Sequence, residues 1–236
     1  MSGPLVDPHE TPHWLRRLVE ISGELDARTF TRFSPPPGDG RVRDASVLIL
    51  FGDDTHGPDV LLLRRAETLG SHAGQVAFPG GGAEEGDDGP VHTALREAEE
   101  ETGVDPSGVR PVAVLPRLYV PVSRFAVTPV LAHWHEPSPV RPVDPGETAA
   151  VARVPVADLA DPANRFLVRK EGAGWKGPAF EVGGLFVWGF TAGLLSVLLT
   201  LGGWEREWDH TDVRDLDVAL ARHEARARQL EPGARE

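Results

Sequence analysis

The chain has 236 residues, a formal net charge of −12 and no cysteine, and 40% of its residues are hydrophobic. This length favours one large domain over two, and the apolar share suffices for a sizeable core. The negative charge argues against nonspecific binding to nucleic acid or to an anionic membrane, and the lack of cysteine excludes disulfides and thiolate chemistry. The N-terminal residues lack the basic and apolar regions of a signal peptide, so we expect a cytoplasmic protein.

The first elements along the chain are a helix, a linker and two strands. Apolar residues at helical spacing predict a helix over residues 13–28, despite Gly23. Residues 34–42 are rich in proline and glycine and indicate a linker. Residues 45–51 and 60–63 are then expected as two strands joined by a turn-rich segment.

A helix over residues 90–102 follows, because Gly89-Pro90 suits a helix start and Gly103 a C-terminal cap. Further strands are expected at residues 109–118, 125–134, 149–154 and 185–188. Many strands around two or three helices indicate an α+β fold or an α/β/α sandwich, with a mixed β-sheet between helices.

Residues 182–204 carry no charge. An uncharged segment of this length is about long enough to span a bilayer. The glycines indicate instead a turn at Gly183-Gly184, a short strand over residues 185–188, and a buried helix over residues 191–201 that is closed by Gly202-Gly203. The flanks are acidic as well as basic, with no excess of Lys and Arg on one side, so we expect no membrane span.

The expected organisation has three parts. Residues 1–41 form an N-terminal helix and linker, residues 42–204 form the main domain, and residues 205–236 form a charged C-terminal helix or tail.

The helix over residues 90–102 carries a cluster of acids. With Glu97 set at 0°, Glu100 lies at roughly −60° and Glu101 at roughly +40° around the helix axis. These three carboxylates share one edge of the helix, whereas Glu99 lies on the far side, at about 200°. We therefore expect Glu99 to be solvated only.

Two interpretations suit this cluster. A solvated acidic face is one, because each like-charge pair at this spacing costs only a few tenths of a kcal/mol. A site for a hard divalent cation is the other, since Mg²⁺ prefers carboxylate oxygens together with substrate phosphate. The adjacent Gly80-Gly81-Gly82, which by itself also suits a flexible turn, favours the second interpretation because glycines let the backbone approach a ligand closely.

The sequence from Arg96 to Val104, REAEEETGV, resembles the end of the Nudix box, Arg-Glu-apolar-x-Glu-Glu-x-Gly-apolar. The box opens with a glycine, five residues and an acid, and both Asp87 and Asp88 stand at that distance from a glycine, with Asp in place of the usual Glu. The resemblance implies a Nudix fold, a Mg²⁺ or Mn²⁺ cofactor and hydrolysis of a small-molecule diphosphate.

The resemblance also implies roles for the acids. Glu97 and Glu101 hold metal, and Glu100 is a further metal ligand or the catalytic base. Arg96 pairs with a metal-side acid, expected to be Glu100 at i+4, unless it is an ordinary residue of the helix surface. Glu147 lies in a turn-rich loop and is a further candidate to contact metal or activate water, the alternative being a solvated loop acid.

A second motif precedes the box. The segments LLLRRA, residues 61–66, and GQVAFPGG, residues 74–81, resemble the signature of coenzyme A pyrophosphatases. That signature has Leu-Leu-Thr-x-Arg-Ser/Ala, then Arg, then Gly, then Phe-Pro-Gly-Gly. Leu63 and Gly70 depart from it, where threonine and arginine are expected. The resemblance covers roughly residues 45–200.

The signature implies coenzyme A or its derivatives as substrate, cut to 3′-phospho-adenosine 5′-phosphate and 4′-phosphopantetheine. The matching candidates for substrate binding are Arg65, Gly74, Gln75, Phe78, Gly80 and Gly81. Arg64 and Arg65 point to opposite faces of a strand, and the signature favours Arg65 as the phosphate contact; for each, the alternative is a surface arginine.

Two other functions remain open. A general Nudix hydrolase that acts on ADP-ribose, dinucleotides or nucleotides is one, and Gly70 keeps it open. A Nudix-fold sensor that binds nucleotide without cutting it is the other, against which the intact acids count. We expect no nucleic-acid or membrane partner, and the oligomeric state is open, with a homodimer among the alternatives.

Overall fold

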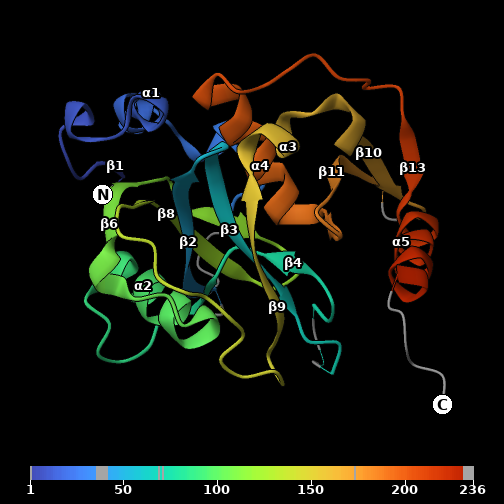
Figure 1. Cartoon of the computed structure of the whole chain (residues 1–236), viewed down its shortest axis with the longest axis horizontal. Helices are drawn as coiled ribbons and strands as arrows, with labels where there is room; N and C mark the ends of the chain where they lie inside the picture. Colours follow the sequence, from blue (N-terminus) through green and yellow to red (C-terminus); the bar gives the residue numbers. More distant parts are fainter. Residues whose placement is uncertain (1, 36–41, 69, 71, 173, 231–236) are drawn as a thin grey trace.

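The computed structural model describes residues 2–35, 42–68, 70, 72–172 and 174–230, which build two β-sheets and five α-helices (Figure 1). The helices are α1 (His13–Ile21), α2 (Gly89–Thr102), α3 (Val156–Ala160), α4 (Gly189–Gly202) and α5 (Leu216–Leu230). The short 3₁₀ helices are η1 (Pro8–Glu10), η2 (Ala27–Thr29), η3 (Pro106–Gly108) and η4 (Pro162–Asn164).

The larger sheet has nine strands in the order β1-β6-β8-β2-β3-β4, with β5 paired to β2, β7 to β8 and β9 to β3. Its strands are β1 (Gly3–Pro4), β2 (Arg43–Asp54), β3 (Gly57–Arg65), β4 (Val76–Ala77), β5 (Gly80–Gly82), β6 (Val109–Val114), β7 (Leu118–Val120), β8 (Phe125–Trp134) and β9 (Thr148–Pro155). The sheet is mixed, because β2 runs parallel to β8 while its other pairings are antiparallel.

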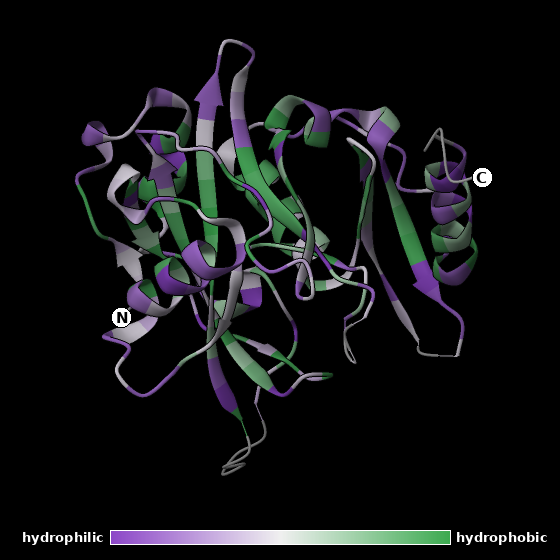
Figure 2. Ribbon diagram, turned by 60° about the horizontal axis from the view of Figure 1, so that its bottom comes forward, coloured by the Kyte–Doolittle hydropathy of each residue, from purple (hydrophilic) through white to green (hydrophobic). Residues whose placement is uncertain are grey.

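Strand β2 shows why helices cover both faces of this sheet. Residues 48–51 of this strand are buried, and successive side chains of a strand point to opposite faces. Leu48 and Leu50 enter the core under α2, whereas Ile49 and Phe51 enter the core shared with α1, α3 and α4. Figure 2 shows the hydrophobic residues concentrated along the central strands. The expected mixed sheet between helices is therefore confirmed.

A second sheet of four strands, in the order β12-β11-β10-β13, lies beside the first (Figure 1). Its strands are β10 (Arg165–Lys170), β11 (Trp175–Val182), β12 (Leu185–Val187) and β13 (Val213–Asp215). Only β12 was expected from the sequence. The hairpin of β10 and β11 carries charged residues and a Gly-Pro pair, which weaken the alternating apolar pattern of a strand.

Several expected boundaries shift for local reasons. The N-terminal helix ends at Ile21, before Gly23, and the chain makes a separate turn of 3₁₀ helix capped by Asp26. The strand expected over residues 109–118 is interrupted before β7 at Pro116, which has no N–H to donate. The tail forms helix α5, which was one of the two alternatives expected there.

The outer segments contact the central one. Strand β1 pairs with β6, α1 contacts α4, and β13 pairs with β10. The three-part division stays a prediction. The apolar segment forms β12 and α4 with a turn between β11 and β12 at Gly183 and Gly184, both at positive φ. Among the described residues, no helix is both long and apolar enough to cross a membrane.

Two glycines of α4 should respond to alanine in opposite directions. A Cβ at Gly193 would meet no atom within 4 Å, so Gly193→Ala should raise the free energy of unfolding by about 0.5–1 kcal/mol through lower backbone entropy in the unfolded chain. A Cβ at Gly202 would lie 2.5 Å from the Trp204 ring, so Gly202→Ala should lower it by about 1–3 kcal/mol. Chemical denaturation measures both, and a destabilised Gly193→Ala would contradict the packing described for α4.

Candidate active site

Helix α2 is held by its small side chains. Ala94 and Ala98 are fully buried against the leucines of β2, which places the acid-rich edge of the helix next to β5. The helix begins at Gly89 and ends at Thr102, and Gly103 adopts the left-handed conformation, with φ of 67°, as its C-cap. Both ends agree with the sequence prediction to within one residue.

Arg96 is the most connected side chain on this edge. Its Nε and Nη2 donate to the two carboxylate oxygens of Asp87 at 3.1 and 3.0 Å, and Nη2 also donates to the Gly82 carbonyl at 3.1 Å. Its Nη1 donates to Glu97 at 3.0 Å and to Glu100 at 3.1 Å. The pairing with Glu100 at i+4 is therefore present, together with three further partners.

Asp87 attaches the loop that precedes α2 to the helix. Its side chain is only 4% exposed and also accepts hydrogen bonds from the Thr93 hydroxyl and the Glu84 N–H. Arg96, followed by the Glu84 N–H, holds the pKa of Asp87 well below its usual range. Asp88, in contrast, occupies the N-cap without a side-chain capping bond. Asp87 thus fastens the loop to the helix through Arg96, whereas the sequence spacing left Asp87 and Asp88 as alternatives.

Glu101 is the most deeply buried of the helix acids. Its side chain is 10% exposed and accepts a hydrogen bond of 2.9 Å from the Gly80 N–H, while Arg65 Nη1 lies 3.7 Å from its Oε1. Burial raises the pKa of Glu101 to about 7; the charges of Glu97 and Glu147 add to this, whereas Gly80 and Arg65 oppose it. Glu147, although on another loop, is therefore within electrostatic reach of Glu101.

Glu97 lies against β5, where only glycine leaves room. A Cβ on Gly81 would sit 2.5 Å from the carboxylate atoms of Glu97, and a Cβ on Gly80 would sit 2.3 Å from the Ser46 carbonyl oxygen. Burial raises the pKa of Glu97, and Arg96 acts in the opposite direction. Close backbone approach, and not loop flexibility, explains these glycines.

The donor set fits a divalent cation. Glu97 and Glu101 offer hard carboxylate oxygens in a confined space, and their raised pKa values show that positive charge there would favour the ionised forms. Glu100 is 59% exposed and turned to Arg96. Within the described ranges, no three His, Asp or Glu side chains already converge on one point suited to a metal. The assignment of Glu97, Glu100 and Glu101 as ligands stays a prediction.

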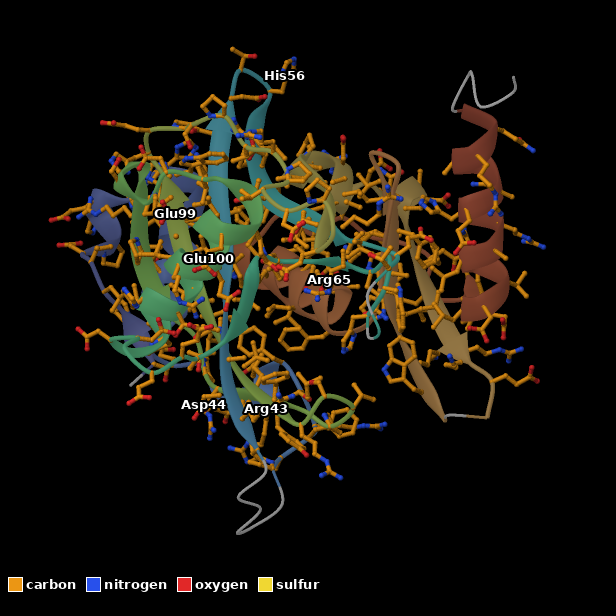
Figure 3. All side chains as sticks on the ribbon, turned by 90° about the horizontal axis from the view of Figure 1, so that it is seen from below. Arg43, Asp44, His56, Arg65, Glu99 and Glu100 are labelled. Carbon is orange, nitrogen blue, oxygen red and sulfur yellow. The ribbon has the colours of Figure 1, made fainter. Side chains whose placement is uncertain are left out.

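The candidates for substrate binding divide into two groups. Arg65, Gly80 and Gly81 lie beside the buried acids. In Figure 3, Arg65 lies between the second sheet and the side of the molecule that carries Glu99 and Glu100. The Nε of Arg65 is buried and lacks a hydrogen-bond partner among the described residues, so this N–H is available to donate to a ligand oxygen.

The other candidates lie elsewhere. Phe78 is 2% exposed inside the main core, where it packs and does not face the acids. Gly74 and Gln75 line a cavity with Arg64, and the Gln75 carbonyl accepts a hydrogen bond of 2.9 Å from the Arg65 N–H. The structure therefore does not gather all six candidates around one point.

The NUDIX domain family matches residues 40–173. The chain is 38% identical over 144 residues to Nudix hydrolase NudL of Cronobacter sakazakii, covering 60% of this chain and 73% of that protein. It is 35% identical over 173 residues to the mitochondrial Nudix hydrolase 15 of Arabidopsis thaliana, covering 69% of this chain but only 59% of that protein, less than two thirds of its length. The crystal structure of RenU, a Nudix hydrolase from M. smegmatis, superimposes with a TM-score of 0.48 at 19% identity, covering 72% of this chain and 91% of that one.

The family match spans more than half of the chain and contains every residue of the Arg96 network. This chain belongs to the Nudix family.

Proposed function

We propose that the protein is a metal-dependent hydrolase of the diphosphate in coenzyme A or its derivatives, releasing 3′-phospho-adenosine 5′-phosphate and 4′-phosphopantetheine. The observation that carries the proposal is the meeting of two motifs in space. The strand end that bears Arg65 and the glycines of β5 lie directly against Glu97 and Glu101 of α2. The proposed phosphate contact and the proposed cation ligands are thus adjacent.

Each side chain has a defined task in this proposal. Glu97 and Glu101 hold the cation, and Arg96 fixes Glu97 by a hydrogen bond of 3.0 Å. Arg65 orients a phosphate oxygen with its planar guanidinium. A divalent cation, when bound, supplies positive charge opposite the diphosphate and promotes ionisation of water.

Water attacks phosphorus in line with the bridging oxygen, the bond between phosphorus and that oxygen breaks, and a carboxylate takes the proton of the water. Glu100 and Glu147 are the two candidates for this base. Both are exposed, and Glu100 additionally accepts a hydrogen bond from Arg96.

A broader nucleoside-diphosphate hydrolase is the second candidate function, because of Gly70. This residue is exposed, and a Cβ there would meet nothing within 4 Å. The loop therefore has room for the arginine that the coenzyme A signature carries but lacks its charge. In this second candidate function, ADP-ribose or a dinucleotide is the substrate.

A panel of diphosphates tests the proposal. Purified protein with Mg²⁺ or Mn²⁺ should hydrolyse coenzyme A with a higher kcat/KM than ADP-ribose or a dinucleotide, and a chelator should abolish turnover, because carboxylates alone cannot neutralise a diphosphate. Product analysis by chromatography identifies the bond that is cut. Nucleotide binding without hydrolysis of any diphosphate would identify a sensor instead.

Two glutamates of α2 form a matched pair of substitutions. Glu97→Gln should lower kcat by at least about 10²-fold, the scale of losing one catalytic electrostatic contact. Glu99→Gln makes the same change on the same helix at an exposed position and should leave kcat nearly unchanged. Turnover at limiting Mg²⁺ measures both, with circular dichroism as the control for folding. Full activity of Glu97→Gln would remove it from the metal site.

Restoring the missing arginine tests the substrate. Gly70→Arg should raise kcat/KM for coenzyme A by about 10- to 100-fold. This range corresponds to the free energy of one hydrogen bond to a charged group, about 1.5–3 kcal/mol. Competition between coenzyme A and ADP-ribose in one reaction gives the order of consumption. ADP-ribose consumed first by the wild type, with the order unchanged in Gly70→Arg, would favour the broader hydrolase.

A further inference from the structure

A cavity of about 240 Å³ lies between the β3–β4 loop, strand β12 and helix α5. Its wall includes Arg64, Gln75, Phe186, Trp188, Leu220 and His223, together with the acids Glu67 and Glu224. Val76, which also lines it, belongs to the core on the sheet face opposite α2. The cavity and the buried acids are therefore on opposite faces of the sheet.

One strand nevertheless joins the two places. Arg64 and Arg65 are consecutive residues at the end of β3, and their side chains leave on opposite faces. Arg65 reaches Glu101, whereas Arg64 lines the cavity. Gln75, on the cavity side, accepts a hydrogen bond of 2.9 Å from the Arg65 N–H, so the two places adjoin at the end of β3.

We propose that this cavity binds the heteroaromatic base of the nucleotide half of the substrate, and that α5 thereby takes part in substrate selection. The inference rests on the proposed hydrolysis of a nucleotide-containing diphosphate. It assigns a base subsite to a helix that lies outside the matched family region, residues 40–173.

The aromatic wall suits a planar ring. Trp188 is half-buried and Phe186 is 5% exposed. Trp175 packs edge-on against Trp188, with ring centroids 6.2 Å apart and planes at 64°, which fixes the orientation of the indole. Every nucleobase has a π-face that can stack on such a ring.

The polar groups suit the edge of a base and its phosphate. His223 Nδ1 lies 3.2 Å from Glu181 Oε1, so in the neutral ring Nδ1 donates there and Nε2 is left as an acceptor. The Gln75 amide supplies both a donor and an acceptor. Arg64 brings a guanidinium to the same wall, which suits a phosphate carried by the ribose. Glu67 and Glu224 bring two carboxylates, which can accept hydrogen bonds from the amino group of a base or from the hydroxyl groups of the sugar.

The size also favours one ring system. Sites for whole drug-sized ligands enclose about 300–1,000 Å³, so a cavity of about 240 Å³ takes a base with part of its sugar and leaves the diphosphate outside it. The diphosphate is then directed toward the strand end, where Arg65 lies.

Helix α5 is docked firmly enough to form a wall. Leu216 and Ala219 are buried in a small core with Phe166 and Val168 of the second sheet. Arg226 Nη1 adds a hydrogen bond of 3.1 Å to Glu181. The positions of Leu220 and His223 therefore follow from packing of the helix.

Calorimetric binding to the full chain tests the assignment. The probes are adenosine 3′,5′-bisphosphate and inorganic pyrophosphate, which share phosphate but differ in the base. Leu220→Trp should fill the cavity and lower the affinity for the bisphosphate by at least about 10-fold, the scale of losing a stacked base. The affinity for pyrophosphate should stay unchanged. Val218→Trp is the matched control, since Val218 is 49% exposed on the same helix and does not line the cavity; it should change neither affinity.

A second variant does not depend on packing. Arg64 is half-exposed, so Arg64→Gln should fold normally and weaken adenosine 3′,5′-bisphosphate by about 10-fold or more, with a smaller effect on adenosine 5′-monophosphate. Wild-type affinity for the bisphosphate in both Leu220→Trp and Arg64→Gln, or no nucleotide binding by the wild type, would overturn the base subsite. Hydrolysis of the diphosphate panel is measured in a separate experiment. If the protein hydrolyses none of the diphosphates, the proposed function is wrong. If it hydrolyses them, the proposed function stands even where the base subsite is overturned.

Discussion

Arg96 uses one planar guanidinium to join three parts of the fold: helix α2, the loop that precedes it and strand β5. Its donors reach Asp87, Glu97, Glu100 and the carbonyl of Gly82, all at 3.0–3.1 Å. A fork of five fixed N–H donors can satisfy such a set, which a lysine ammonium could not do in the same geometry. The position of the loop and the orientation of Glu97 both follow from this single side chain.

The same network explains how one helix carries so many acids. Arg96 offsets the charges of Glu97 and Glu100, and Glu101 is turned away to the Gly80 N–H and Arg65. Burial still raises the pKa of Glu97 and Glu101, so the compensation is incomplete. The residual unfavourable free energy is concentrated where a cation would relieve it, which links the acidic helix to the metal-dependent hydrolysis that we propose.

The divergence of β2 and β3 makes space for the site. The two strands pair near their hairpin and then separate, after which β2 pairs with β5 and β3 with β4. Strands β4 and β5 therefore lie between the diverging strands. The acids lie on one face and the aromatic cavity on the other, with α5 closing the cavity from the second sheet.

Local sequence alone determined the elements whose signals are local. The continuous apolar run in β2, the Gly-Pro start and the Gly103 cap of α2, and the helical phase that separates Glu99 from its neighbours follow from local sequence pattern and from the conformational freedom of glycine. Tertiary structure decided the rest. Strands β4 and β5 are two and three residues long and exist only through partners distant in sequence, and Asp87 became the partner of Arg96 through a turn that the spacing left ambiguous. The burial of Phe78 and the aromatic cavity depend on contacts with α4, β12 and α5, because burial is set by what packs against a side chain and local sequence does not encode that partner.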